Sequence, residues 1–117
     1  MMFVMLVHRL KLLQQAKLDD RNSVGSTPLH LATAKGNKGI VTQLLEANAK
    51  PNALDNYGST ALHWAAYNGR EAVVDLLLEA KADPKIMDKN GYTAAKIAEG
   101  NGRAALAQKL REAEARP

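Results

Sequence analysis

The 117-residue chain contains no cysteine, and this absence removes several functional classes at once. Without thiols the protein has no disulfide framework, no thiolate nucleophile and no cysteine-ligated zinc site. The absence fits a reducing compartment, so we expect a cytoplasmic protein, with the nucleus as an alternative. At this length we expect a single domain, residues 1–117, with one modest core.

Long hydrophobic runs are missing as well. The opening MMFVMLV has seven apolar residues and is followed directly by the charge-bearing HRLKLL. A membrane-spanning helix needs about 20 apolar residues, and a secretory signal carries basic residues before its apolar stretch. We therefore predict no membrane partner.

The chain also lacks a concentrated patch of one charge. It has 16 basic and 12 acidic residues, and the two signs are interspersed over its length. Nucleic-acid-binding domains normally carry a basic stripe on one face. The pattern favours a solvated surface, and a nucleic-acid binder is the weaker alternative.

Catalytic signatures are absent from the sequence. There is no nucleophile elbow, phosphate loop or HExxH pattern, and EGNGR at 99–103 follows a helical segment instead of the strand that a dinucleotide loop requires. We predict that the protein is not an enzyme and uses no cofactor.

What the chain does contain is an internal repeat. TPLHLA begins at Thr27, TALHWA at Thr60 and TAAKIA at Thr93, with a constant step of 33 residues. Aligning residues 22–54 with 55–87 gives 14 identities in 33 positions without a gap. Three glycines after the motifs keep the same step: Gly36, Gly69 and Gly102.

Each unit is predicted to be a pair of short helices followed by a turn. The motif threonine, for example Thr60, stands where a helix N-cap is expected. Leu62 and Ala66 then lie on one apolar face, and Gly69 ends the helix. The second helix is too apolar to stand alone, so neighbouring units must cover it.

A 33-residue period that carries T-P-L-H-x-A resembles the ankyrin-repeat family. The resemblance implies an all-α solenoid of stacked helix-turn-helix units with β-hairpin-like connecting loops. It divides the domain into a partial repeat at 1–21, repeats at 22–54 and 55–87, and a C-terminal capping repeat at 88–117. In this family the motif histidine, here His30 and His63, joins a hydrogen-bond network with the motif threonine. We interpret both histidines as structural and predict no metal site.

Several positions depart from the family pattern. Asn48 and Lys81 replace the glycine expected after the second helix, where lysine should cost about 1 kcal/mol or more. Gly39 should weaken its helix by up to ~1 kcal/mol relative to alanine. Ala94 and Lys96 replace the proline and histidine of the last motif.

The two ends of the chain differ. The C-terminal QKLREAEARP is polar where inner repeats carry leucines, as a terminal cap requires. Residues 3–14 are predicted to form a second helix with Phe3, Leu6 and Leu10 on one apolar side. One hypothesis is that this side, with Met1 and Met2, buries itself against a partner or a second copy of the chain. The alternatives are an irregular cap over its own stack, a fragment of a larger protein, or an engineered repeat protein without a natural partner.

The family generally binds partner proteins with its hairpin tips and the exposed edge of the first helix. All three tyrosines of the chain occupy such positions. By the 33-residue phase the contact positions hold Ser23, Val24, Ser26, Ala34, Lys35, Leu54, Asn56, Tyr57, Ser59, Tyr67, Asn68, Met87, Lys89, Asn90, Tyr92 and Asn101. Trp64 replaces an aliphatic residue of the motif and is interpreted as core packing.

The resemblance therefore predicts a small protein–protein interaction adaptor or scaffold. Three repeats should offer a surface of ~800 Å² per partner or less. Lys35, Lys50 and Lys89 favour an acidic partner protein. The alternative from another class is a structural unit that self-associates through its apolar N-terminus.

Overall fold

The computed structural model describes residues 17–116. The predicted N-terminal helix and its apolar residues Phe3, Leu6 and Leu10 lie outside the described residues, so the homodimer stays a prediction. Six helices have both ends inside the described part: α2 (Pro28–Lys35), α3 (Lys38–Glu46), α4 (Ala61–Asn68), α5 (Glu71–Glu79), α6 (Ala94–Gly100) and α7 (Ala104–Glu114). The same residues contain no strand, and none of their helices is long and apolar enough to cross a membrane.

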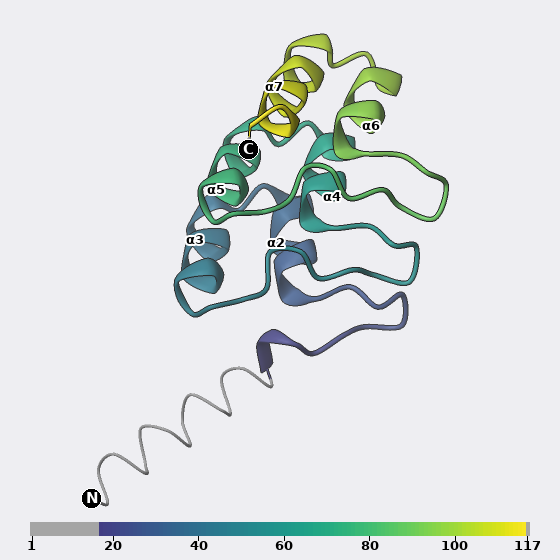
Figure 1. Ribbon diagram of the computed structural model, residues 1–117. Helices are drawn as coiled ribbons and strands as arrows, with labels where there is room; N and C mark the ends of the chain where they lie inside the picture. The colour runs from purple at the N-terminus through teal and green to yellow at the C-terminus, as the bar shows by residue number, and fades with distance from the viewer. Residues whose placement is uncertain (1–16, 117) are drawn as a thin grey trace, which may run out of the picture.

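The helices stack in two rows (Figure 1). The first helices of the units, α2, α4 and α6, pack on one another in one row, and α3, α5 and α7 form the other. Long loops project from the first row to one side, where they lie one above another. This arrangement confirms the predicted all-α repeat solenoid.

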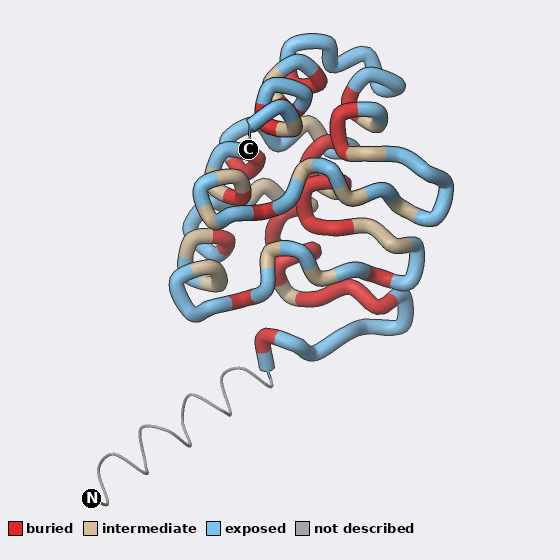
Figure 2. The backbone as a smooth tube through the Cα atoms, in the orientation of Figure 1, coloured by how far each residue is buried: buried red, intermediate tan, exposed pale blue. Residues whose placement is uncertain are grey.

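The core lies between the two rows, where buried residues of both face each other (Figure 2). Leu62 of α4, Leu77 of α5 and Leu110 of α7 are almost fully buried, together with Val41 and Val74. Each such aliphatic side chain stabilises the fold by roughly 1.5–3 kcal/mol relative to exposure. Because one unit offers only a few of them, the units must stack to form a continuous core.

The repeated motif sets the helix boundaries. Thr27, Thr60 and Thr93 have extended backbone, and each accepts a hydrogen bond from the N–H group three residues on, so all three are N-caps as predicted. Gly36 and Gly69 end α2 and α4 in the left-handed conformation, with φ of 70° and 68°. Such backbone is free of steric cost only for glycine.

Two side-chain-bearing residues share that left-handed backbone. Asn48 after α3 and Lys81 after α5 have φ of 72° and 70°. The structure thus confirms that both positions require a left-handed backbone, the conformation that glycine adopts most readily. At the other end of the stack, α7 buries Leu106 and Leu110 and exposes Gln108, Arg111 and Glu112, which agrees with the predicted polar cap.

Candidate protein-binding face

The projecting loops are hairpin-like turns, each closed by one side chain. The Oδ1 atom of Asp55 accepts hydrogen bonds from the backbone N–H groups of Tyr57 and Ser59, both over 2.9 Å. Asp88 and Asn22 make the same pair of bonds inside their own turns. An Asp or Asn at this position therefore fixes the shape of every loop tip.

Neighbouring turns are also bonded to each other. The N–H of Asn56 donates to the carbonyl of Val24 over 2.9 Å, and the N–H of Lys89 donates to the carbonyl of Tyr57 over 3.0 Å. These bonds run from one repeat to the next, so they align the tips into one surface.

The motif histidines connect the first helices to these turns. Nδ1 of His63 accepts from the Thr60 N–H over 3.0 Å, and Nε2 donates to the carbonyl of Tyr92 in the next unit over 2.8 Å. His30 makes the equivalent bonds with Thr27 and the carbonyl of Ser59. Since Nδ1 accepts a backbone N–H, the proton that each ring donates lies on Nε2.

These contacts leave neither ring with a nitrogen for a metal ion. Within residues 17–116 no three His, Asp or Glu side chains are grouped in a way that could hold one. Burial is the main reason that the pKa of His30 lies below its ordinary value of 6.5, because the charged imidazolium loses its hydration there.

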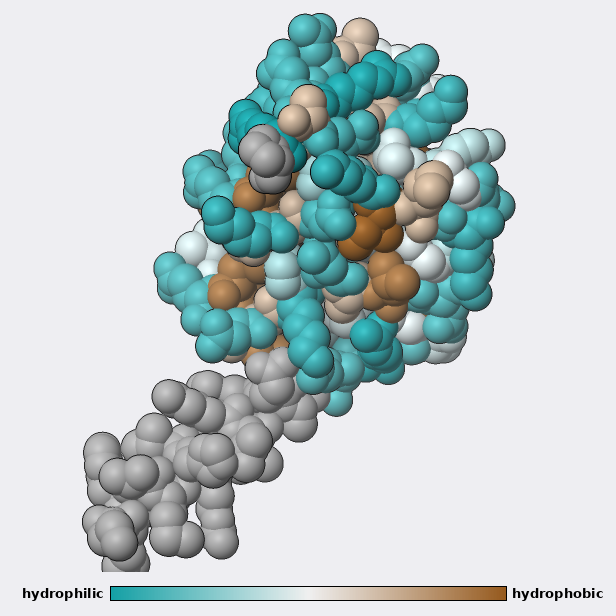
Figure 3. Space-filling view, in the orientation of Figure 1, coloured by the Kyte–Doolittle hydropathy of each residue, from teal (hydrophilic) through white to brown (hydrophobic). Residues whose placement is uncertain are grey.

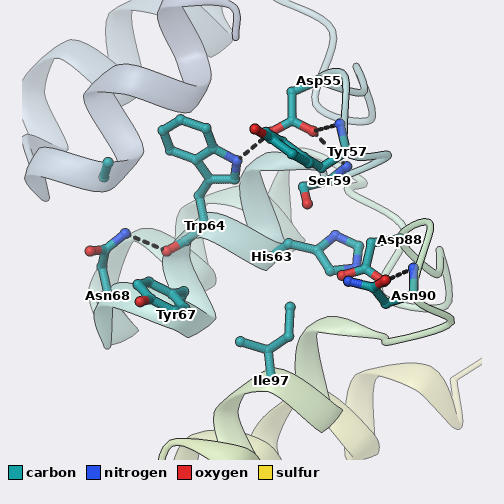
Figure 4. A pocket seen from close by; sticks show the side chains of 11 residues that line it. Asp55, Tyr57, Ser59, His63, Trp64, Tyr67, Asn68, Asp88, Asn90 and Ile97 are labelled. Carbon is teal, nitrogen blue, oxygen red and sulfur yellow. Dashed lines mark hydrogen bonds between the residues drawn. The ribbon is translucent and has the colours of Figure 1, made fainter. Parts of the chain in front are cut away.

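A hollow of about 790 Å³ lies between the first-helix row and the hairpins. Figure 4 shows the rings of Tyr57, Trp64 and Tyr67 around it, with Asp88 and Asn90 on the hairpin side. Its lining comes from all three described units: Ala34, Asp55, Tyr57, Ser59, His63, Trp64, Tyr67, Asn68, Asp88, Asn90 and Ile97. A mostly apolar concave surface with a few placed polar groups is typical of a binding site.

Trp64 belongs to this hollow and not to the core. Its side chain is only partly buried, and the indole N–H donates to Oδ2 of Asp55 over 2.9 Å. The indole ring also meets the ring of His30, with ring centroids 5.3 Å apart. The interpretation of Trp64 as core packing is therefore wrong. Its equivalent Leu31 is exposed, whereas Ile97 is half-buried and packs against the edge of the core.

The predicted contact residues divide into two groups. Tyr57, Tyr67, Asn68 and Asn90 are exposed and line the hollow, together with the half-buried Ala34 and Ser59. The others outside its lining are exposed as well: Ser23, Val24, Lys35, Leu54, Asn56, Met87, Lys89, Tyr92 and Asn101. Ser26 is a correction, because it is buried beneath the turn and offers no contact surface.

Sequence reasoning did not single out Asp55, Asp88 or Ile97 as part of this site. The available signal was the 33-residue step, which places Asp55 and Asp88 at one position and Trp64 and Ile97 at another. The charge of Asp55 and Asp88 matters, because among residues 17–116 two carboxylates and no lysine or arginine line the hollow. Lys50, one of the lysines predicted to favour an acidic partner, is outside this lining, and its Nζ lies 4.0 Å from Oδ2 of Asp19.

The face drawn in Figure 3 is mainly hydrophilic, and its hydrophobic atoms gather in small separate patches. Isolated patches of this kind are ordinary on a soluble surface. The exposed rings of Tyr57 and Tyr67 lie beside the hollow.

Comparison with known proteins agrees with this architecture. A family model described as ankyrin repeats in three copies matches residues 4–88. A search of curated protein sequences found no match. The family match, the 33-residue motif and the stacked helix pairs all agree, and the chain belongs to the ankyrin-repeat family.

Proposed function

We propose that the protein is an adaptor that binds a partner protein in the hollow between its first helices and its hairpins. Ankyrin repeats are generally protein–protein interaction modules, and they are typically non-catalytic. The observation that carries the proposal is the exposure of the rings beside this hollow: Tyr57 and Tyr67 are 64% and 65% exposed.

Exposed tyrosines are effective contact residues at a protein interface. Tyrosine is enriched at interface hot spots because it offers a large rigid contact area and a polar tip. Tyr57 stands on a hairpin and Tyr67 on α4, so a bound segment would contact both walls of the hollow. Leu54, Met87 and Tyr92, at 45%, 61% and 47% exposure, extend the apolar surface along the tips.

The hollow is held in place before a partner arrives. Side-chain bonds close each turn, backbone bonds join the turns, and His63 connects α4 to the third hairpin. A pre-organised surface loses little conformational entropy on binding, which favours affinity from a modest contact area. The acidic partner predicted from lysines is supported by Lys35 and Lys89, which lie near this face outside the lining, and not by Lys50.

Affinity capture with two matched baits tests the proposal. The first variant carries Tyr57→Ala and Tyr67→Ala, and the control carries Ile40→Ala, which removes a side chain of 46% exposure from α3 in the other helix row. All three substitutions are at exposed positions, so each bait should keep its fold, which circular dichroism checks.

We expect a protein retained by the natural chain and by the Ile40→Ala bait to be lost from the double-tyrosine bait. Equal retention by all three baits would place the binding surface elsewhere. A loss from the Ile40→Ala bait alone would move it to the second-helix row.

A further inference from the structure

The second and third repeats differ at the position that, in the second, supplies a hydrogen-bond donor to the hairpin carboxylate. In the second unit Oδ2 of Asp55 is occupied by the indole N–H of Trp64 over 2.9 Å. One period later the pair is Asp88 and Ile97, and isoleucine has no donor to offer. Asp88 uses Oδ1 for the N–H groups of Asn90 and Tyr92, and no described residue donates to its Oδ2.

This carboxylate lies in the wall of the aromatic hollow (Figure 4). No cationic side chain is among the lining residues, and Asp88 has no ion-pair partner among residues 17–116. The half-buried Asp88 and the three aromatic residues line the same hollow, which therefore combines a negative charge with negative ring faces. Both features attract a cation.

We infer that the hollow takes an arginine side chain of the partner protein, with its guanidinium against the rings of Tyr57, Trp64 or Tyr67 and an N–H donated to Oδ2 of Asp88. This inference rests on the proposed function and names the partner's anchoring residue. A partner protein with a net negative charge can still carry this one arginine.

Arginine suits the hollow better than lysine does. Its guanidinium is planar, stacks on aromatic faces and is more weakly hydrated than an ammonium group, so less hydration is lost when it enters. Several donors on one plane also let it bond Asp88 while it stays stacked. Lysine would bring a compact, strongly hydrated charge to the same place.

The chain contains its own reporter and its own control. Trp64 is the single tryptophan, so its indole N–H gives one resonance in the lining of the hollow. Asp88→Asn removes the charge while keeping the turn, because Asn22 closes the first hairpin with the same two Oδ1 bonds. Glu79→Gln removes one exposed carboxylate from α5, outside the lining.

The experiment is a titration of the ¹⁵N-labelled protein with Nα-acetyl-arginine amide, alongside the lysine and glutamine analogues. We expect the arginine probe to shift the Trp64 indole resonance saturably, and its Kd to rise at least tenfold in Asp88→Asn but to stay unchanged in Glu79→Gln. Added salt should weaken binding to the natural chain.

Three results would overturn the inference: no saturable shift with the arginine probe, equal affinity for arginine and glutamine probes, or equal affinity in Asp88→Asn. Binding of the lysine probe as tight as that of arginine would reject arginine as the anchor. The proposed function has its separate test in the double-tyrosine bait, so a partner lost from that bait without an arginine response rejects the anchor alone.

Discussion

The indole N–H of Trp64 donates to Oδ2 of Asp55, the same carboxylate whose Oδ1 closes the second hairpin. The buried Asp55 side chain thus connects the second hairpin to α4. Asp55 is only 7% exposed, so loss of a donor cannot be fully replaced by water.

We expect Trp64→Phe and Asp55→Asn each to lower the free energy of unfolding by about 1.5–3 kcal/mol, the range for a hydrogen bond to a charged group. Phenylalanine at position 64 leaves Oδ2 of Asp55 without its donor. Asparagine at position 55 places an amide N–H₂ group, also a donor, against the indole N–H of Trp64. Urea denaturation followed by circular dichroism gives the values.

The double variant separates pairing from packing. If the two residues act through this bond, Asp55→Asn should cost much less in the Trp64→Phe background than in the natural one, giving a non-zero coupling energy. Additive losses would show that the two side chains stabilise the fold independently.

Lys81→Gly should stabilise the protein by about 1 kcal/mol, because φ of 70° places the lysine Cβ against its own backbone. Asn48→Gly should give a smaller gain, since asparagine adopts this conformation more readily. Lys81→Ala is the control for charge, because it retains the Cβ and should give no comparable gain. Chemical denaturation of the three variants under one set of conditions measures the order.

Gly58→Ala should be more damaging than Gly91→Ala, although both glycines have left-handed backbone, with φ of 73° and 81°. A Cβ at Gly58 would lie 3.1 Å from the backbone nitrogen of Lys89 in the next hairpin, whereas one at Gly91 meets nothing within 4 Å. We expect an additional loss of about 1 kcal/mol or more for Gly58→Ala, typical of overpacking. Equal unfolding free energies would mean that the hairpins separate without cost.

His30 should make the protein less stable as the pH falls. Burial holds the pKa of His30 in the folded chain below the 6.5 expected when it is exposed. As pH falls through 6.5, His30 becomes protonated in the unfolded chain while it is still neutral in the folded chain. The free energy of unfolding therefore decreases. Above that pH both states are neutral and the contribution of His30 is fully present.

The matched variant is His30→Gln, which lacks the titrating ring. Urea denaturation from pH 7.5 to 5 should show a steeper loss for the natural chain than for the variant. Parallel curves would show that protonation of His30 does not oppose folding.

The helix pairs and their caps were predictable from the sequence because they depend on local chemistry repeated at a constant step. Thr60 caps α4 with its own hydroxyl, and Gly69 ends that helix through its own φ, without help from distant residues. Lys81 was recognisable as strained for the same reason, since its position in the unit fixes its backbone.

The hollow was decided by the tertiary structure. The period shows that Trp64 and Ile97 are equivalent, but it does not say that both face the groove or that Asp88 shares a space with Tyr57 and Tyr67. That depends on how far and at what angle one unit stacks on the next, which side-chain packing and the bonds between hairpins set together. For this protein the sequence alone determined the helix pair and its caps, and stacking decided which side chains of different units meet.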